Sequence, residues 1–284
     1  MRMGREALIL ATPAALFFLA IVAMPLAMTI LLSFNHWDSS IGIVSILKLE
    51  NYRDIFSDYY FGEIFLRTLR ISMLVTLCCI AIGVPEAYIL RRMNEPWRSI
   101  MILVVIGPLL VSVVARTLGW ALILAGNGLL SQLLQALSVI DSPVSLMFTE
   151  TGVVIALTHV LVPFMVLAVW AALGRMDPAA ERAAQSLGAG QLTIFRRIVL
   201  PQAMPGILSG SIIVFTLAAS AFATPAIIGG RRLKVAATLA YDEFLNTLNW
   251  PLGAAVAVLL LISIVFIVVA WNRLLERRYK QVFA

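Results

Sequence analysis

The side chains best suited to metal or redox chemistry are few and widely separated. Cys78 and Cys79 are neighbours inside an apolar run, where adjacent helical residues point in different directions and cannot easily form a disulfide. His36 and His159 stand far from both cysteines and from each other, so no metal-ligand spacing is present. We therefore expect no metal site and interpret the cysteines as small apolar packing residues.

The sequence also lacks a nucleotide-binding loop and a credible nucleophile. No GxxxxGK[ST] motif occurs, so the chain has no loop of the kind that cradles phosphates. Ser211 lies in the apolar stretch SGSII without a predictable histidine partner, which argues against serine hydrolysis. We expect no catalytic residue in this chain and no cofactor bound by it.

Isolated polar side chains lie within or beside long apolar stretches, where ionisable groups are costly and mark functional sites by default. Glu86 lies shortly before Arg91, so it either pairs with an arginine or faces a ligand. Trp120 also suits an aromatic belt at an interface between apolar and aqueous surroundings. The residues polar enough to line a path through these apolar stretches are His159, Asn127, Ser220, Thr224, Trp120 and Glu86.

The composition indicates which solvent surrounds these residues. The chain has 284 residues, of which 61% are hydrophobic and 13% charged, whereas soluble domains carry about 25% charged residues. So much apolar sequence cannot be hidden inside a water-soluble protein of this length, because a large surface still faces solvent. The bilayer is therefore the expected solvent.

Apolar stretches long enough to cross a membrane predict an all-α polytopic protein. A helix needs about 20 apolar residues to span the hydrocarbon core. The first stretch is too long for a signal-peptide core and has no obvious cleavage site, so we interpret it as a retained helix. The six predicted spans are roughly 8–33, 67–90, 99–122, 150–173, 204–228 and 251–272.

Arginine and lysine placement predicts the orientation, because cytoplasmic loops carry the excess of both residues. Both termini are then cytoplasmic, as an even number of crossings requires. The smaller set, on the opposite side, comprises Lys48, Arg53, Arg231, Arg232 and Lys234. The larger set comprises Arg2, Arg5, Arg91, Arg92, Arg98, Arg175, Arg182, Arg196, Arg197, Arg273, Arg277, Arg278 and Lys280.

Prolines interrupt several of the predicted spans, namely Pro85, Pro108, Pro163 and Pro225. Each removes a helix hydrogen bond, and such breaks persist at membrane depth only where protein or a water-filled cavity satisfies the freed groups. Pro163 frees the carbonyl of His159 near mid-membrane. Either a packed kink or a piece of the solute path would explain this coincidence.

A stretch of about thirty residues, 174–203, separates the fourth and fifth predicted spans. Asp177 followed by Pro178 predicts a helix start, and the alanine-rich run after it propagates well. Gly188 supplies the stop. A second short helix is expected over 191–199, ended by Leu200-Pro201, since a residue before proline is pushed out of the helical region.

Two short helices joined at a glycine form a compact knob on the cytoplasmic surface. Its apolar face can dock a protein partner or lie flat on lipid headgroups, and these alternatives stay open on physical grounds alone. Within the fifth span, Gly206 and Gly210 have the spacing that lets helix backbones approach closely.

The 174–203 stretch resembles the permeases of binding-protein-dependent ABC importers. Their signature is Glu-Ala-Ala, three residues, Gly, nine residues and Ile-x-Leu-Pro; here Arg182 occupies the glutamate position, and Glu181 precedes it. In that family the knob docks into a groove on an ATPase subunit. The residues that the resemblance assigns to this coupling loop are Glu181, Arg182, Ala183, Ala184, Gly188, Phe195, Ile198, Leu200 and Pro201.

The resemblance extends over most of the chain and is greatest to the polyamine/opine-type branch. It implies a single permease domain over 1–284 with the type I importer fold, in a bacterial inner membrane. It also implies import of a small amine or amino-acid-like solute by alternating access. The stretches that carry it are 83–92, 107–120, 161–167 and 227–261.

The implied partners are two ATPase subunits that use ATP and Mg²⁺, a second and different permease subunit, and a periplasmic solute-binding protein. The alternatives are a stand-alone secondary transporter or channel, which would show an internal repeat of spans, and a membrane-anchored structural partner without transport activity.

Overall fold

The computed structural model describes residues 5–38 and 40–279. Six helices in these ranges are long and apolar enough to cross a membrane, as predicted: Thr12–Ser33, Tyr59–Arg92, Val113–Ala136, Glu150–Leu173, Gln191–Ala219 and Trp250–Arg273. The chain divides into two compact units, Met1–Glu63 with Leu239–Ile262, and Ile64–Thr238 with Ser263–Ala284.

The first unit begins with α1 (Arg5–Ser33), followed by an antiparallel hairpin of β1 (His36–Asp38) and β2 (Gly42–Val44), in which His36 pairs with Val44. Helix α2 (Glu50–Ser57) is tied to the end of α1 because Asn51 donates to the carbonyls of Ser33 and Asn35, both at 2.9 Å. The unit also contains the start of α3, the end of α11 (Ala236–Leu245) and the start of α12 (Trp250–Tyr279).

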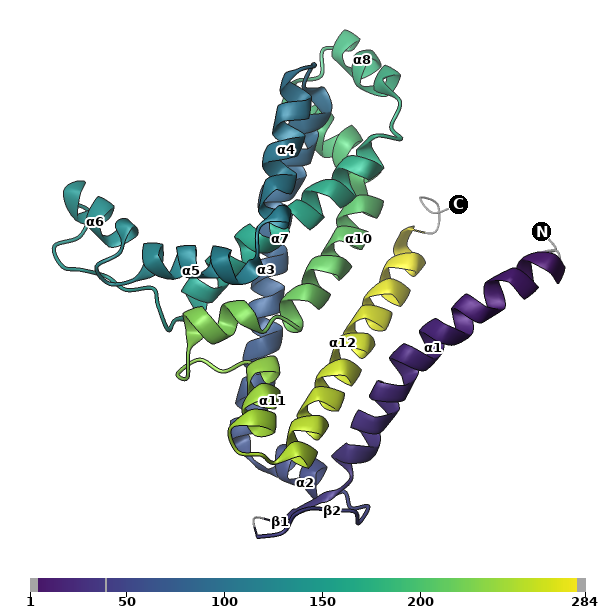
Figure 1. Cartoon of the computed structure of the whole chain (residues 1–284). Coiled ribbons are helices and arrows are strands. Elements are labelled where there is room, and N and C mark those ends of the chain that lie inside the picture. Colours follow the sequence, from purple (N-terminus) through teal and green to yellow (C-terminus); the bar gives the residue numbers. More distant parts are fainter. Residues whose placement is uncertain (1–4, 39, 280–284) are drawn as a thin grey trace. The chain divides into compact units, whose positions relative to one another are not determined.

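The second unit contains most of α3 (Tyr59–Arg92) and the main cluster of buried hydrophobic side chains. Its other elements, labelled in Figure 1 where there is room, are α4 (Trp97–Leu110), α5 (Val113–Leu124), α6 (Leu129–Ala136), α7 (Glu150–Leu173), α8 (Pro178–Ser186), α9 (Gln191–Ile194), η1 (Phe195–Val199), α10 (Leu200–Ala219) and η2 (Pro225–Gly229).

The packing of α10 against α7 forms the centre of the second unit. A Cβ atom built on Gly206 would lie 2.6 Å from Ala172 Cβ and 2.7 Å from the carbonyl oxygen of Ala168. A Cβ on Gly210 would lie 2.8 Å from Met165 Sδ. The two glycines therefore let these helix backbones approach closely, as their spacing predicts, and the partner helix is α7.

The third predicted span, 99–122, is wrong as a continuous helix. The chain breaks between α4 and α5, where Val111 is extended and its N–H donates to the Pro108 carbonyl at 3.4 Å. Pro108 has no N–H to continue the ladder, so α4 ends within a turn of it. The span-length element is instead Val113–Ala136, and α4 is a shorter apolar helix.

The fifth predicted span, 204–228, is wrong at both ends. The helix extends from Gln191 to Ala219 and then breaks at Ser220. Pro225 cannot donate to the carbonyl of Ala221, which removes a bond that continued helix would need. The fourth predicted span coincides with α7, and Pro85 and Pro163 lie inside unbroken helices. The prediction of one domain over 1–284 stays a prediction.

Candidate functional site

The short helix α8 begins and ends at the residues whose types predict it. The Asp177 carboxylate accepts from the N–H of Ala179 at 2.8 Å, and Pro178 occupies the first helical position. At the other end Gly188 has a φ of +81°, a conformation that glycine adopts without strain. The Gly188 N–H donates to the Gln185 carbonyl at 2.9 Å, which closes the helix.

The separate second helix expected over 191–199 is wrong. Val199 and Leu200 keep helical dihedral angles, and α9, η1 and α10 form one continuous helix. Within η1 the hydrogen bonds span five residues instead of four, and the Leu200 N–H donates to Phe195. The wide turn shifts the hydrogen bonds just before Pro201 by one carbonyl, so that each N–H there reaches five residues back. The helix continues through Pro201 although the proline has no N–H to donate.

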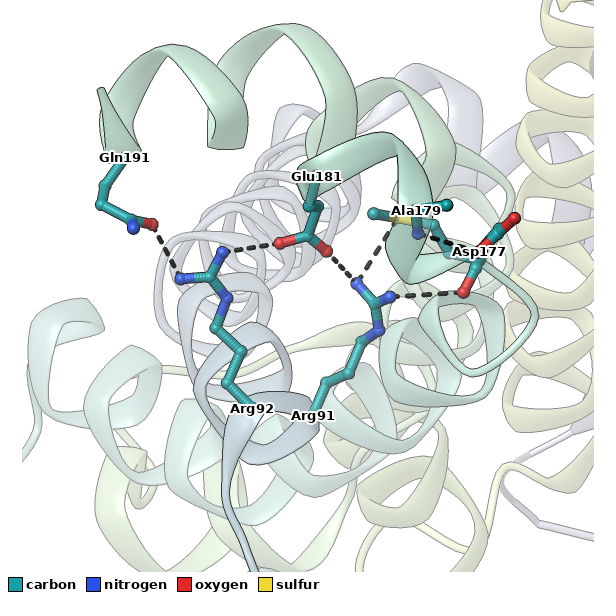
Figure 2. A network of polar contacts seen from close by, with 7 residues as sticks. Arg91, Arg92, Asp177, Ala179, Glu181 and Gln191 are labelled. Carbon is teal, nitrogen blue, oxygen red and sulfur yellow. Dashed lines mark hydrogen bonds and ion pairs between the residues drawn. The ribbon is translucent and has the colours of Figure 1, made fainter. Parts of the chain in front are cut away.

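An ion cluster holds α8 against the end of α3 (Figure 2). Glu181 accepts from Arg91 Nη1 at 2.5 Å and from Arg92 Nη2 at 2.6 Å, one arginine on each carboxylate oxygen. The exposed fractions of the side chains are 9% for Glu181, 13% for Arg91 and 36% for Arg92. The carboxylate and Arg91 are thus nearly removed from solvent, so loss of either partner would leave an uncompensated buried charge.

The same two arginines bind further parts of the loop. Arg91 Nη2 donates to the Met176 carbonyl at 3.3 Å, and Arg92 Nη1 donates to Gln191 Oε1 at 2.7 Å. The Arg92 guanidinium also lies 4.5 Å from the centre of the Tyr88 ring. The last turn of α3 therefore contacts residues before, within and after α8.

These contacts set the charge of Glu181. Burial raises the pKa of the Glu181 carboxyl, but the hydrogen bonds and charges of Arg92 and Arg91 outweigh that effect, so its pKa lies below the ordinary value. The cluster is consequently ionised at neutral pH. Arg91 and Arg92 both bind Glu181, so neither of them supplies the arginine with which Glu86 was expected to pair as one alternative.

The remaining residues of the predicted coupling loop separate into inner and outer positions. Phe195 is half-buried and packs on Tyr88 with ring centres 5.2 Å apart. Leu187 and Leu192, which the prediction did not include, are 88% and 69% exposed. The other half-buried members are Ala184, Ile198 and Leu200, and the exposed members are Arg182, Ala183, Gly188 and Pro201.

The predicted solute-path residues are only partly brought together. Glu86, Trp120 and His159 line one cavity of about 530 Å³. Thr224 lines a different cavity of about 520 Å³, together with Arg116. Ser220 is exposed at the end of α10, and Asn127 is exposed in the turn after α5. No finding tests which of these residues a solute meets, so the path stays a prediction.

Comparison with known proteins identifies the family. Residues 79–281 match the family described as binding-protein-dependent transport system inner membrane component. The chain belongs to this family. It is therefore a transport permease of the inner membrane, and it crosses that membrane several times.

Relatives and solved structures agree with this assignment. The permease is 32% identical over 260 residues to the spermidine/putrescine transport system permease protein PotB of Escherichia coli (strain K12), covering 90% of this chain and 94% of the relative. A chain of a bacterial ABC transporter that imports alginate has a TM-score of 0.80 at 18% identity, covering 97% and 96%. A chain of the alginate transporter in complex with its pentasaccharide-bound periplasmic protein has 0.78 at 19%, covering 96% and 95%. The structural likeness shows the ABC importer permease fold.

Gly188 offers a direct test of the turn after α8. Gly188→Val should destabilise the α8 turn by about 1–2 kcal/mol, because L residues are strained at positive φ. A built Cβ meets nothing within 4 Å, so the effect comes from the backbone alone. Gly188→Asn should cost much less, because Asn tolerates this conformation. Proteolysis of the purified permease across 174–190 reports the difference, and equal protection of both variants would contradict it.

Proposed function

We propose that this permease forms one half of the membrane passage of an ATP-driven importer and that separate ATPase subunits drive it. The observation that carries the proposal is α8, a short helix that the Glu181 cluster fixes to α3 and that ends at Leu187, the capping residue, which is 88% exposed. An exposed leucine on a rigidly held helix suits a protein partner, since a lipid-facing role would not require the ion cluster.

Leu187 and Leu192 form the apolar part of the proposed docking surface, and Arg182, Arg196 and Arg197 are exposed on the same segment. Complementary charge steers a docking partner and fixes its register. We expect an ATPase groove with apolar walls and an acidic rim. The permease itself then binds no ATP, and the Mg²⁺ and nucleotide belong to the two ATPase subunits.

The proposed cycle is alternating access. ATP binding closes the ATPase pair, and the closing motion displaces α8 in each permease. The Glu181 cluster passes the displacement to α3, and the continuous helix from Gln191 to Ala219 passes it to the core around α7.

Two further proteins complete the proposed importer. A second, homologous but different permease supplies the other half of the passage, and a periplasmic binding protein delivers the solute on the opposite side of the membrane. The alginate transporter supports the second partner by analogy, because it forms a complex with a periplasmic protein that holds an alginate pentasaccharide.

The proposed solute is a small cationic amine. The spermidine/putrescine permeases support this class, because each of them aligns with about nine-tenths of this chain. Glu86, a carboxylate on a membrane helix that lines a cavity, supplies a counter-charge for an ammonium group.

Reconstituted vesicles test the proposal. Uptake of a radiolabelled amine, measured with spermidine and with 6-aminohexanoate, should require the permease pair, the ATPase subunits, external binding protein and internal ATP, and vanadate should stop it. ATP hydrolysis should rise when loaded binding protein is added. Uptake by this chain alone, without ATPase, would instead favour a secondary transporter or channel.

A further inference from the structure

One cavity in the second unit has unlike polar groups at different levels of a mostly apolar lining. It has a volume of about 530 Å³ and lies among α3, α4, α5 and α7. Most of its wall is aliphatic, including Ile82, Val104 and Val162. Its polar lining comes from Glu86, Trp120, Thr158 and His159. The number of polar groups is small, as in sites that orient a ligand by a few contacts.

The hydrogen bond between Trp120 and His159 determines what the imidazole offers to a ligand. Trp120 Nε1 lies 3.1 Å from His159 Nδ1, and an indole N–H can only donate. His159 Nδ1 must therefore accept, which leaves the neutral imidazole with its proton on Nε2. The free nitrogen of His159 is consequently a hydrogen-bond donor.

Thr158 adds an unused hydroxyl beside this donor. Thr158 as a whole is 7% exposed, and its hydroxyl oxygen Oγ1 is buried without a hydrogen-bond partner. A threonine in a helix ordinarily donates to a carbonyl in the preceding turn. An unsatisfied hydroxyl in an apolar wall costs free energy, and a ligand group in the cavity would relieve that cost.

Glu86 lines the cavity at a different level from Thr158 and His159. Cys79 Sγ is 3.8 Å from the Thr158 carbonyl oxygen, so Thr158 and Cys79 lie at the same level. Glu86 follows Cys79 on α3 by about 10 Å at 1.5 Å per residue. Cys78, Ile82 and Glu86 share one face of α3 and line the cavity between the two levels.

We propose that this cavity binds a linear amine that carries a hydrogen-bond acceptor at its far end, such as an ω-amino acid or a monoacylated diamine. Its ammonium pairs with Glu86, its methylenes contact the aliphatic wall and Trp120, and its carboxylate or amide oxygen accepts from His159 Nε2–H and Thr158 Oγ1. The site rests on the proposed import function and narrows its solute class.

An unmodified diamine fits these groups less well. Its second ammonium would face the Nε2–H of His159, and two donors cannot share a hydrogen bond. An amine with an acceptor satisfies the groups at both levels. These unlike groups therefore select between solutes of equal length that differ only in one terminal group.

Four probes of matched chain length separate these cases: 6-aminohexanoate, 1,6-diaminohexane, hexylamine and hexanoate. Calorimetric titration uses the full permease–ATPase complex in nanodiscs. We expect 6-aminohexanoate to bind at least about tenfold more tightly than 1,6-diaminohexane, which is the factor that one hydrogen bond to a charged group supplies. Equal binding of these two probes, or tighter binding of the diamine, would overturn the proposal.

Two variants assign the two levels of the cavity. Glu86→Gln should weaken 6-aminohexanoate and hexylamine by at least about tenfold and spare hexanoate. His159→Phe should remove the preference for 6-aminohexanoate over the diamine. Asp141→Asn, at an exposed loop position outside the cavity, is the matched control and should change none of the affinities. Unchanged binding in Glu86→Gln would refute the assignment.

A separate readout keeps the two proposals distinguishable. ATP hydrolysis stimulated by loaded binding protein reports the importer function and the integrity of the complex. If the unaltered complex lacks that stimulation, the importer proposal fails. If stimulation is present and the probes bind without the expected order, the cavity proposal alone fails.

Discussion

Glu181→Gln should reduce solute uptake at least tenfold and loosen α8 while the membrane helices stay folded. The variant keeps the side-chain shape but leaves Arg91, whose side chain is 13% exposed, without its anion. Removing one partner of a buried ion pair costs roughly 3–5 kcal/mol. Because Arg92 is 36% exposed and partly solvated, we expect a value of about 3 kcal/mol, at the lower end.

Hydrogen exchange of residues 178–186 measures this effect. A loss of about 3 kcal/mol should accelerate exchange of the α8 amides by roughly 100-fold, with little change in α7. Glu95→Gln is the matched control, because Glu95 binds Arg98 at 2.6 Å in an exposed pair close to the end of α3. Normal protection and uptake in Glu181→Gln would mean that the cluster does not fix α8.

Gly206→Ala should destabilise the permease more than alanine at any other glycine compared below. The new Cβ would lie 2.6 Å from Ala172 Cβ and 2.7 Å from the Ala168 carbonyl oxygen. Backbone atoms and a Cβ cannot rotate away, so α10 and α7 must separate. Overpacking of this kind costs about 1–3 kcal/mol, and we expect the upper end of that range.

Thermal unfolding of the purified permease, followed by size-exclusion chromatography, ranks the glycine variants. Gly210→Ala should be milder, because its Cβ would meet the flexible Met165 Sδ at 2.8 Å. Gly119→Ala meets nothing within 4 Å and should stabilise α5 slightly, by up to about 1 kcal/mol. Equal melting temperatures for the Gly206 and Gly119 variants would contradict the close approach of α7 and α10.

Local signals made much of the fold predictable. The bounds of α7 and the start and end of α8 follow from apolar length, an acidic cap, a proline and a glycine, all of which act within one helical turn. The six-helix class follows from apolar length as well, since a helix is the one single segment that satisfies its own backbone groups in lipid.

The wrong predictions concern prolines, whose effect depends on the hydrogen bonds around them. Pro201 does not end its helix because η1 supplies a wide turn just before it. Pro108 does end α4, whereas Pro163 lies in an unbroken helix. The same residue type thus has opposite outcomes, so the presence of a proline does not by itself predict where a helix ends.

The ion cluster was also beyond local reasoning. Arg91 and Arg92 indicated only membrane orientation, and Glu181 was notable only for standing one residue before the family's glutamate position. Their pairing joins residues about ninety positions apart. The sequence named Glu86, Trp120 and His159, which line one cavity, but it gave no reason to select Thr158 beside them.

The wide turn η1 also has a rotational consequence. A π-helical turn holds one residue more than an α-helical turn, and each residue of a regular helix turns the chain by about 100°. Because a full turn is completed in either case, deleting one residue from Phe195–Val199 would leave a plain helix in which the exposed Leu192 keeps nearly the same direction relative to the core face of α10. Deleting one residue from a regular stretch beside the wide turn would instead rotate the two faces relative to each other by about 100°. The wide turn therefore accommodates one extra residue without changing the angular relation between the exposed face of this helix and the face that packs in the core.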